Sequence, residues 1–159
     1  MTHLPTPERL LEEATRMLAR KYHADPAQIA RDILSAGRVR VPVTAFNDAL
    51  APLETIVAYL RDVRGLSLAE IARVTGRDPR AIGVTYKRAT KALGKPFADV
   101  AHTVYSVPAD VLCDHRLSVL EHVVMHLRTT YRLPLAEIAR LLHRDPRTIG
   151  TIVRRAKER

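Results

Sequence analysis

Two segments of this 159-residue chain repeat each other closely. Residues 66–83 (LSLAEIARVTGRDPRAIG) align without gaps to residues 133–150 (LPLAEIARLLHRDPRTIG), and thirteen of the eighteen positions are identical. The similarity extends back through 53–61 and 120–128, and reaches 41–42 and 107–108 after a shift of one residue. Each unit is therefore about 50–55 residues long. Because a solenoid needs about three or more copies, two small domains are the better interpretation.

Each repeat unit is predicted to contain three helices. Apolar residues recur at helical spacing at the start of each unit. They are Leu53, Ile56, Val57 and Leu60 in the first unit and Leu120, Val123, Val124 and Leu127 in the second. A shorter second helix begins at Ser67, which forms a capping box with Glu70. The third helix begins at Asp78-Pro79 and at Asp145-Pro146, where Asp is the N-cap and Pro suits the first helical position.

Only about two residues separate the second and third predicted helices. Ala72 is small where these helices would cross, Gly76 can adopt the left-handed conformation of a tight turn, and Ile82 would fill the core. The second unit has His143 at the glycine position, and His can adopt this conformation at some cost. Two short helices with a tight joint, packed on a longer first helix, are typical of a DNA-binding helix-turn-helix.

The repeat units resemble the helix-turn-helix superfamily, and most closely the fourth-region type of bacterial sigma factors and related regulators. The resemblance lies in the Leu-Ser-x-x-Glu-Ile-Ala run, the Arg-Asp-Pro start of the last helix and the Arg/Lys-rich helix itself, within 66–91 and 133–159. It covers about two thirds of the chain and implies a DNA-binding fold. No segment resembles the second region that melts promoters in sigma factors, so a complete sigma factor is not expected.

The third helix of each unit is expected to expose a polar face that enters the major groove. Residues near the start of such a helix reach bases, which predicts base contacts by Arg80, Ala81, Val84, Arg147, Thr148 and Thr151. Phosphate contacts are predicted for Arg77, Lys87, Arg88, Arg144, Arg154 and Arg155, and Lys91 completes the outward set. The alternative interpretation is a solvated helix face. The units differ at two base-reading positions, so we expect related but non-identical half-sites in asymmetric DNA.

The chain carries a formal charge of +9, from 26 Lys and Arg against 17 Asp and Glu. This excess indicates an anionic partner, and because no block of five like charges exists, folded surfaces must present it. The third helices and the turns before them hold nearly all of the excess. Proteins that bind single strands stack bases on aromatic rings, so a chain with no Trp, two Phe and five Tyr favours duplex DNA.

The N-terminal residues 1–37 lie outside the repeat and are predicted to form a helical hairpin. Its helices begin at Thr6-Pro7 and at Asp25-Pro26, and the second ends at Gly37. A hairpin of this size is not stable alone, so it must pack on a repeat unit or on another chain. Docking on the first unit is expected, and dimerisation or partner binding is the alternative. The predicted fold is all-α: hairpin 1–37, first unit 41–93, linker 94–106 and second unit 107–159.

Other residues point to no further chemistry. Cys113 is the single cysteine, cannot form an internal disulfide, and is predicted to be a small apolar filler. His122 and His126 lie at i, i+4 with His115 nearby, but the first repeat has no histidine at the two aligned positions, so no metal is expected. No catalytic motif is present, and the sequence predicts a non-enzyme without cofactors. Without an apolar run or signal peptide, the chain is expected to be cytoplasmic and nucleoid-associated, with no membrane partner.

Gly83 and Gly150 occupy equivalent positions inside the third helices, where Gly costs about 1 kcal/mol relative to Ala. We expect close packing on a neighbouring helix to explain them, and close approach to a DNA backbone is the alternative.

The leading functional hypothesis is a sequence-specific double-stranded DNA-binding protein, a transcriptional regulator whose two helix-turn-helix units read adjacent major grooves. One alternative is a sigma-like interaction module that docks on RNA polymerase or another protein. A further alternative is an architectural or DNA-processing accessory protein with weak sequence preference.

Overall fold

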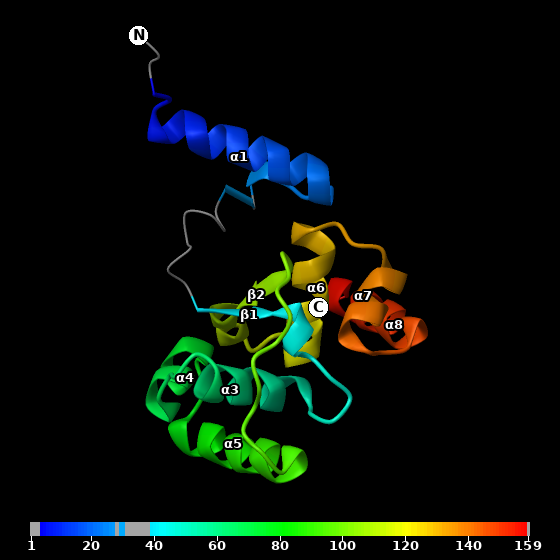
Figure 1. The fold of residues 1–159 in the computed structure, drawn as a ribbon. Helices are drawn as coiled ribbons and strands as arrows, with labels where there is room; N and C mark the ends of the chain where they lie inside the picture. Colours follow the sequence, from blue (N-terminus) through cyan, green and yellow to red (C-terminus); the bar gives the residue numbers. More distant parts are fainter. Residues whose placement is uncertain (1–3, 28, 31–38, 159) are drawn as a thin grey trace.

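The structure is a computed structural model that describes residues 4–27, 29–30 and 39–158. This part of the chain is mostly helical, as predicted, but one two-stranded sheet makes an all-α class too narrow (Figure 1). The α-helices are α1 (Pro7–Tyr22), α3 (Pro52–Asp62), α4 (Leu68–Thr75), α5 (Pro79–Leu93), α6 (Val119–Thr130), α7 (Leu135–Leu142) and α8 (Pro146–Lys157). The strands are β1 (Arg40–Pro42) and β2 (Ser106–Pro108), followed by the 3-10 helices η1 (Val43–Ala45) and η2 (Ala109–Cys113).

Helices α3–α5 and α6–α8 form two three-helix units that match the repeat. In each unit the last helix packs on both earlier helices. The apolar positions read from the sequence form the core, since the side chains of Ile56, Leu60, Ile71 and Ile82 are almost fully buried. Burying aliphatic side chains of this size contributes about 1.5–3 kcal/mol each, so this packing is the main stabilising term of each unit.

The predicted helix starts at Ser67, Asp78 and Asp145 are confirmed. The Ser67 Oγ accepts the Glu70 N–H at 3.1 Å, and the Glu70 Oε2 accepts the Ser67 N–H at 3.3 Å. The Asp78 Oδ1 accepts the Arg80 N–H at 2.7 Å. The Asp145 Oδ1 makes the same bond to its second helical residue, also at 2.7 Å. Each cap satisfies backbone donors that have no partner within the helix, which fixes where α4, α5 and α8 begin.

The turns before α5 and α8 share one geometry although only the first contains glycine. Gly76 has φ 66° and His143 has φ 55°, both in the left-handed region. The next residue closes the turn in each case: Arg77 N–H donates to Ala72 O at 2.9 Å and Arg144 N–H donates to the equivalent oxygen, also at 2.9 Å. A side chain in this conformation costs about 1–2 kcal/mol, so the second turn carries a strain that the glycine of the first turn avoids.

Strands β1 and β2 join the two units through equivalent residues. They pair antiparallel, with Val41 opposite Val107, the positions that the repeat aligns. Two further backbone bonds extend the pairing reciprocally: Val43 N–H donates to Tyr105 O at 2.9 Å, and Ala109 N–H donates to Val39 O at 2.9 Å. Because each bond is the repeat counterpart of the other, the units are related by a local two-fold rotation here.

The contacts outside the strands also occur in pairs that the two-fold rotation exchanges. The 3-10 helix η2 of the second unit packs on α4, η1 of the first unit packs on α7, and α3 contacts α6. The buried side chains of both units belong to one continuous core. Part of the predicted linker is anchored as well, because Phe97 is buried and its ring meets Tyr59 edge-on at 6.2 Å between centroids. The two units therefore form one body.

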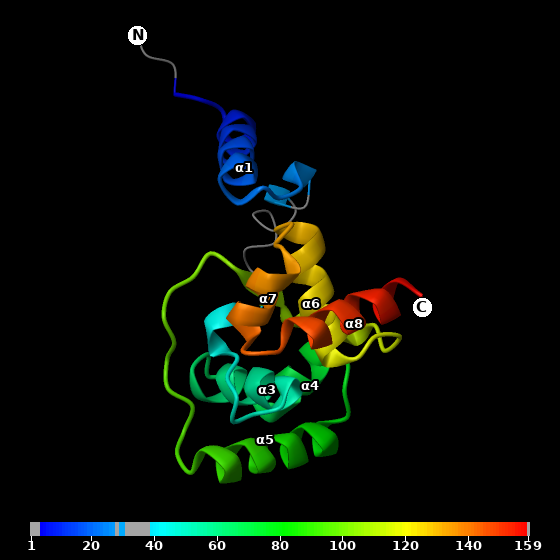
Figure 2. The ribbon, with the colours of Figure 1, turned by 90° about the vertical axis from the view of Figure 1, so that its right-hand side faces the viewer.

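Helix α1 lies at the end of the molecule opposite α5 (Figures 1 and 2). Its predicted start is confirmed, since the Thr6 Oγ1 accepts the Arg9 N–H at 3.3 Å. The prediction placed this segment on the first unit, but the bonds and ring contacts of its described residues are made elsewhere. The Asp25 N–H donates to Thr130 O at 3.3 Å, at the end of α6, so the segment contacts the second unit. The reason is aromatic contact: Tyr22 and Tyr131 both meet the Tyr105 ring edge-on, an arrangement that the repeat pattern does not show.

The second helix of the predicted hairpin falls largely outside the described residues. Residues 26–27 and 29–30 are helical, and the Asp25 Oδ1 accepts the Ala27 N–H at 3.1 Å. The predicted end at Gly37 lies in the part of the chain that the structure leaves undescribed.

Candidate nucleic-acid interface

The outward faces of α5 and α8 carry matched sets of exposed side chains. In α5 the exposed set is Arg80, Ala81, Val84, Lys87, Arg88 and Lys91. In α8 it is Arg147, Thr148, Arg154 and Arg155, with Thr151 half-buried. Val84 is 49% exposed, which is high for a large apolar side chain in a folded protein. The structure thus leaves every predicted base-reading residue at the surface, and most of the predicted phosphate contacts with them.

The positive charge of these two faces is not neutralised locally. Neither 79–93 nor 146–157 contains an Asp or Glu. Among the described residues, the ion pairs do not involve α5 or α8. Helix α7 differs, because Arg140 pairs with Glu137 there, which lowers the pKa of the carboxyl and raises that of the guanidinium. Unpaired cations on a helix surface raise the local potential and attract an anionic partner.

The inner face of α5 fixes which side of the helix faces solvent. Ile82 and Ala89 are completely buried. The Tyr86 hydroxyl donates to Asp62 Oδ1 at 2.7 Å, and the Phe97 N–H donates to Asp62 Oδ2 at 2.8 Å. The bond to Asp62 raises the pKa of the Tyr86 phenol. Asp62 therefore ties α5 to α3 and prevents rotation of the cationic face, a role that sequence reasoning missed because the second repeat has a threonine there.

The predicted phosphate contacts Arg77 and Arg144 are equivalent in the repeat but differ in the structure. The Arg77 Nη1 donates to Thr75 O at 2.9 Å and to Leu112 O at 3.0 Å, so its guanidinium bridges the first turn and η2. Burial lowers the pKa of this guanidinium. Arg144 is exposed. The structure therefore places Arg77 in a contact between the units and leaves Arg144 on the surface beside α8.

The predicted packing explanation for Gly83 and Gly150 is wrong. A Cβ atom built on either glycine would meet nothing within 4 Å outside its own helix backbone. Both positions are half-buried, beside the cationic faces. Nothing within the described molecule therefore requires a residue without a side chain at these two positions.

At Gly76, in contrast, a side chain would crowd a neighbouring residue. A Cβ there would lie 3.1 Å from the Cys113 Sγ and 3.2 Å from the Cys113 Cα. The thiol donates to Val74 O at 3.2 Å, and Cys113 is exposed, so the prediction of a small apolar filler is wrong. Together with the Leu112 carbonyl that accepts from Arg77, this contact holds η2 against the turn that precedes α5.

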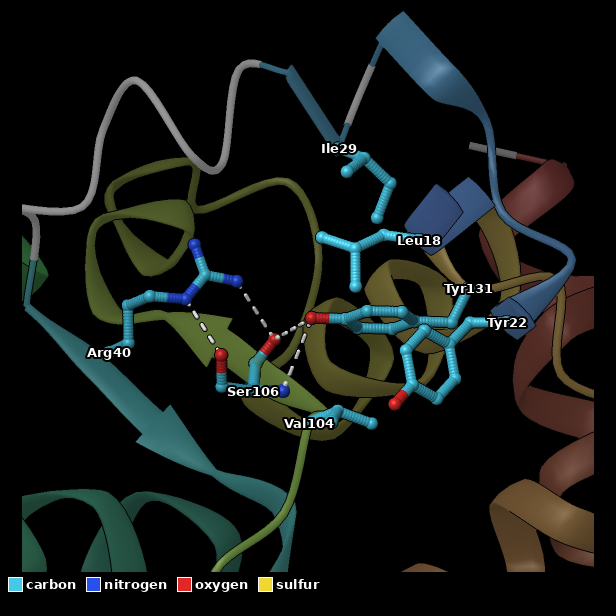
Figure 3. Close-up of a pocket in the computed structure, with 7 residues that line it drawn as sticks. All are labelled: Leu18, Tyr22, Ile29, Arg40, Val104, Ser106 and Tyr131. Atoms are coloured by element: carbon cyan, nitrogen blue, oxygen red, sulfur yellow. Dashed lines mark hydrogen bonds between the residues drawn. The ribbon is translucent and has the colours of Figure 1, made fainter. Parts of the chain in front are cut away.

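A small pocket lies beneath α1, on the side away from α5 (Figure 3). Its volume is about 190 Å³, and it is lined by Leu18, Tyr22, Ile29, Arg40, Val104, Ser106 and Tyr131. Its polar groups bind one another: the Arg40 Nε donates to the Ser106 Oγ at 2.7 Å, and the Tyr131 hydroxyl donates to Ser106 O at 3.3 Å. The pocket could not be predicted from the sequence, because its lining comes from four separate segments of the chain. It is a gap between α1 and the strand pair.

His122 and His126, the pair at i, i+4, are engaged in local structure. The His122 Nε2 bonds to the Asp114 carbonyl, and the His126 Nδ1 lies 3.4 Å from the Thr130 Oγ1. Within the described ranges, no group of three His, Cys, Asp or Glu side chains could hold a metal ion.

Comparison of the chain with protein families, with curated proteins and with solved structures finds no match. None of the described helices is long and apolar enough to cross a membrane.

Proposed function

We propose that the chain is a sequence-specific double-stranded DNA-binding protein that regulates transcription. In this proposal, α4–α5 and α7–α8 are two helix-turn-helix units, of the kind found in the fourth region of sigma factors, and α5 and α8 enter adjacent major grooves. Arg80, Ala81 and Val84 read bases in one groove, and Arg147, Thr148 and Thr151 read bases in the other. The mechanism is occupancy of a DNA site.

The observation that carries the proposal is the equivalence of the two exposed faces. Three cations occur at the same three positions in both helices, at 80 and 147, 87 and 154, and 88 and 155, and all are exposed. A solvated face does not need to keep its charges in register between two copies, whereas two copies that contact phosphates and bases do. The open positions at Gly83 and Gly150 agree with close approach of a partner backbone to both helices.

The first test is selection of bound sequences from a random DNA pool by the full chain, followed by affinity measurements over a range of salt concentrations. We expect an enriched sequence and a specific-to-nonspecific affinity ratio of about 10³ or more. A ratio near one would instead indicate an architectural or DNA-processing protein. Absence of binding at low salt would reject DNA binding and favour the interaction module.

Single substitutions separate the two kinds of contact. Arg80→Ala and Arg147→Ala should each weaken binding to the selected site by about 5- to 150-fold and relax the preference at one base position. Lys87→Ala and Arg154→Ala should weaken binding to all sequences and reduce the slope of log affinity against log salt by about 0.9 each.

The matched control is Arg20→Ala. This residue is an exposed cation in the last turn of α1, away from α5, and its removal changes the net charge by the same amount. It should leave both affinity and salt dependence unchanged. Equal losses for Arg20→Ala and Arg80→Ala would mean that only net charge matters, which would count against a defined interface.

A second candidate function is binding of a protein partner through α1. Leu10 and Met17 are 52% and 65% exposed and lie two turns apart on one side of this helix. The partner is a second copy of the chain, RNA polymerase or another protein. Mass measurement in solution over a range of concentrations tests the first: a dimer that the double variant Leu10→Ser with Met17→Ser abolishes would support it, and a monomer throughout would leave only other partners.

A further inference from the structure

We infer that the DNA site is an imperfect inverted repeat, with one preferred spacing between its two half-sites. This inference rests on the proposed function and concerns the arrangement of the site, which the sequence repeat alone does not determine. Two copies of a unit along one chain can be related by a translation, which would read a direct repeat, or by a two-fold rotation, which reads an inverted repeat.

The strand pair gives the relation between the units. Val41 pairs with Val107, its own repeat equivalent, in an antiparallel ladder. The bonds from Val43 to Tyr105 and from Ala109 to Val39 are exchanged by the same operation. An antiparallel pair centred on equivalent residues has a two-fold axis through its centre, and no translation produces it. The α5 helix and the α8 helix are therefore presented in opposite directions, as the two recognition helices of a symmetric dimer are.

Packing contacts around the strands extend the two-fold relation to the helices of both units. Contacts of η2 with α4 and of η1 with α7 are also exchanged by the rotation. The Arg77 guanidinium bonds across this boundary to Leu112 O at 3.0 Å. Because the units share one core, the separation between α5 and α8 is a property of the fold and not of the segment that connects the units. One spacing between half-sites should therefore be preferred.

Helix α1 leaves the two helices accessible. It lies at the end of the molecule opposite α5, and α8 lies along an outer edge (Figures 1 and 2). Helix α1 therefore does not cover α5 or α8.

The two arms of the repeat should be similar but not identical. Arg80 and Arg147 are equivalent and exposed, so both arms should share a base at the position that they read, and guanine is the natural partner of Arg. Ala81 and Val84 stand where α8 has Thr148 and Thr151. The first pair offers only apolar contact, which suits the thymine methyl group. Thr148 adds a hydroxyl donor and acceptor, whereas Thr151 adds an acceptor, because its hydroxyl donates to Arg147 O at 3.0 Å. This difference makes the inverted repeat imperfect.

The selection experiment tests this inference separately from DNA binding. The expected motif has two related half-sites in opposite orientation, separated by one preferred spacing. A direct repeat or a lone half-site would overturn the two-fold arrangement while leaving DNA binding intact. No enriched sequence would overturn the proposed function itself.

Two variants make the test sharper. Ala81→Thr with Val84→Thr gives α5 the base-reading set of α8, and both positions are exposed, so the fold should tolerate the change. The motif selected by this variant should become more symmetric, with a shift of about five-fold or more in base preference confined to one arm. An unchanged motif would overturn the assignment of that arm to α5.

The second variant inserts four residues, Gly-Ser-Gly-Ser, after His102, an exposed residue in the connecting segment. The preferred spacing should stay the same, because the packed core sets it. A spacing that changes with the insertion would show that the connecting segment positions the units, and would overturn the inference. Thermal unfolding of both variants, compared with the parent chain, establishes that the fold is retained.

Discussion

Replacing Gly83 and Gly150 with alanine should make the protein more stable and, under the proposed function, weaken its binding to DNA. Each glycine lies inside a helix at an ordinary helical φ, and a new Cβ would meet nothing within 4 Å. The full difference in helix propensity, about 1 kcal/mol per site, should therefore appear as stabilisation. The sites lie in different helices of different units, so the gains should add to about 2 kcal/mol. For a chain of this length that corresponds to a rise in Tm of about 4–8 °C.

The same two methyl groups should interfere if a DNA backbone approaches the helices there. Crowding of a well-packed contact by one carbon costs about 1–3 kcal/mol, which is a loss of affinity of roughly 5- to 150-fold. Urea unfolding measures the first effect, and titration of a labelled duplex carrying the selected site measures the second. Thr129→Ala on the exposed side of α6 is the control, because it should raise stability by a few tenths of a kcal/mol without affecting binding.

Two outcomes would refute the reasoning at different points. Lower stability of Gly83→Ala or Gly150→Ala would mean that the positions are not open in the folded protein. Higher stability with unchanged affinity would mean that no partner backbone comes close to them, and the presence of both glycines would then have no explanation in the fold or at the interface.

Three other predictions follow from single contacts. Arg77→Ala should destabilise the protein by about 1–3 kcal/mol in urea unfolding, because two carbonyls lose their donor. Arg144→Ala should leave stability unchanged and weaken DNA binding. Equal stability losses for the two variants would contradict the assignment of Arg77 to a contact between the units. Tyr86→Phe should cost about 1 kcal/mol at neutral pH through loss of the bond to Asp62. Because that bond raises the pKa of the phenol above 10.0, its stabilisation is complete below this pH and is lost as the pH rises through the higher value of the folded state. Stability of the parent chain should therefore fall more steeply above about pH 10 than that of Tyr86→Phe, and parallel profiles would contradict this.

The helices were predictable because their signals are local. Asp78 caps the residue two positions ahead, and the apolar side chains that recur every three or four positions reach the same core. Even the left-handed turn at His143 followed from its alignment with Gly76. The repeat strengthened these predictions, because each helix of one unit has an equivalent in the other unit.

The strand pair was not predictable by the same route. Strands β1 and β2 span three residues each and end in proline, so neither carries the alternation of a strand by itself. They form because two distant copies of one segment meet. The predicted roles of Arg77 and Cys113 depended on the same missing information, since η2 packs on the first turn with contacts that the second turn lacks.

The outward faces of α5 and α8 were predictable for a simpler reason. Once Ile82 and Ala89 are assigned to the core, the helical period alone determines which residues face away. What the period could not show is that Gly83 and Gly150 have open space around them, because this depends on how far each neighbouring helix lies from the glycine.

Because β1 and β2 pair within one chain, the two units do not have to associate from solution, as the subunits of a symmetric DNA-binding dimer must. Two separate subunits come apart on dilution, and their occupancy of a paired site then rises more steeply than the first power of their concentration. In this chain each unit always has the other beside it, at a fixed effective concentration that the chain sets. The paired arrangement of the two units should therefore persist at nanomolar levels. Its two halves are also free to diverge in sequence, because a substitution in one unit does not appear in the other.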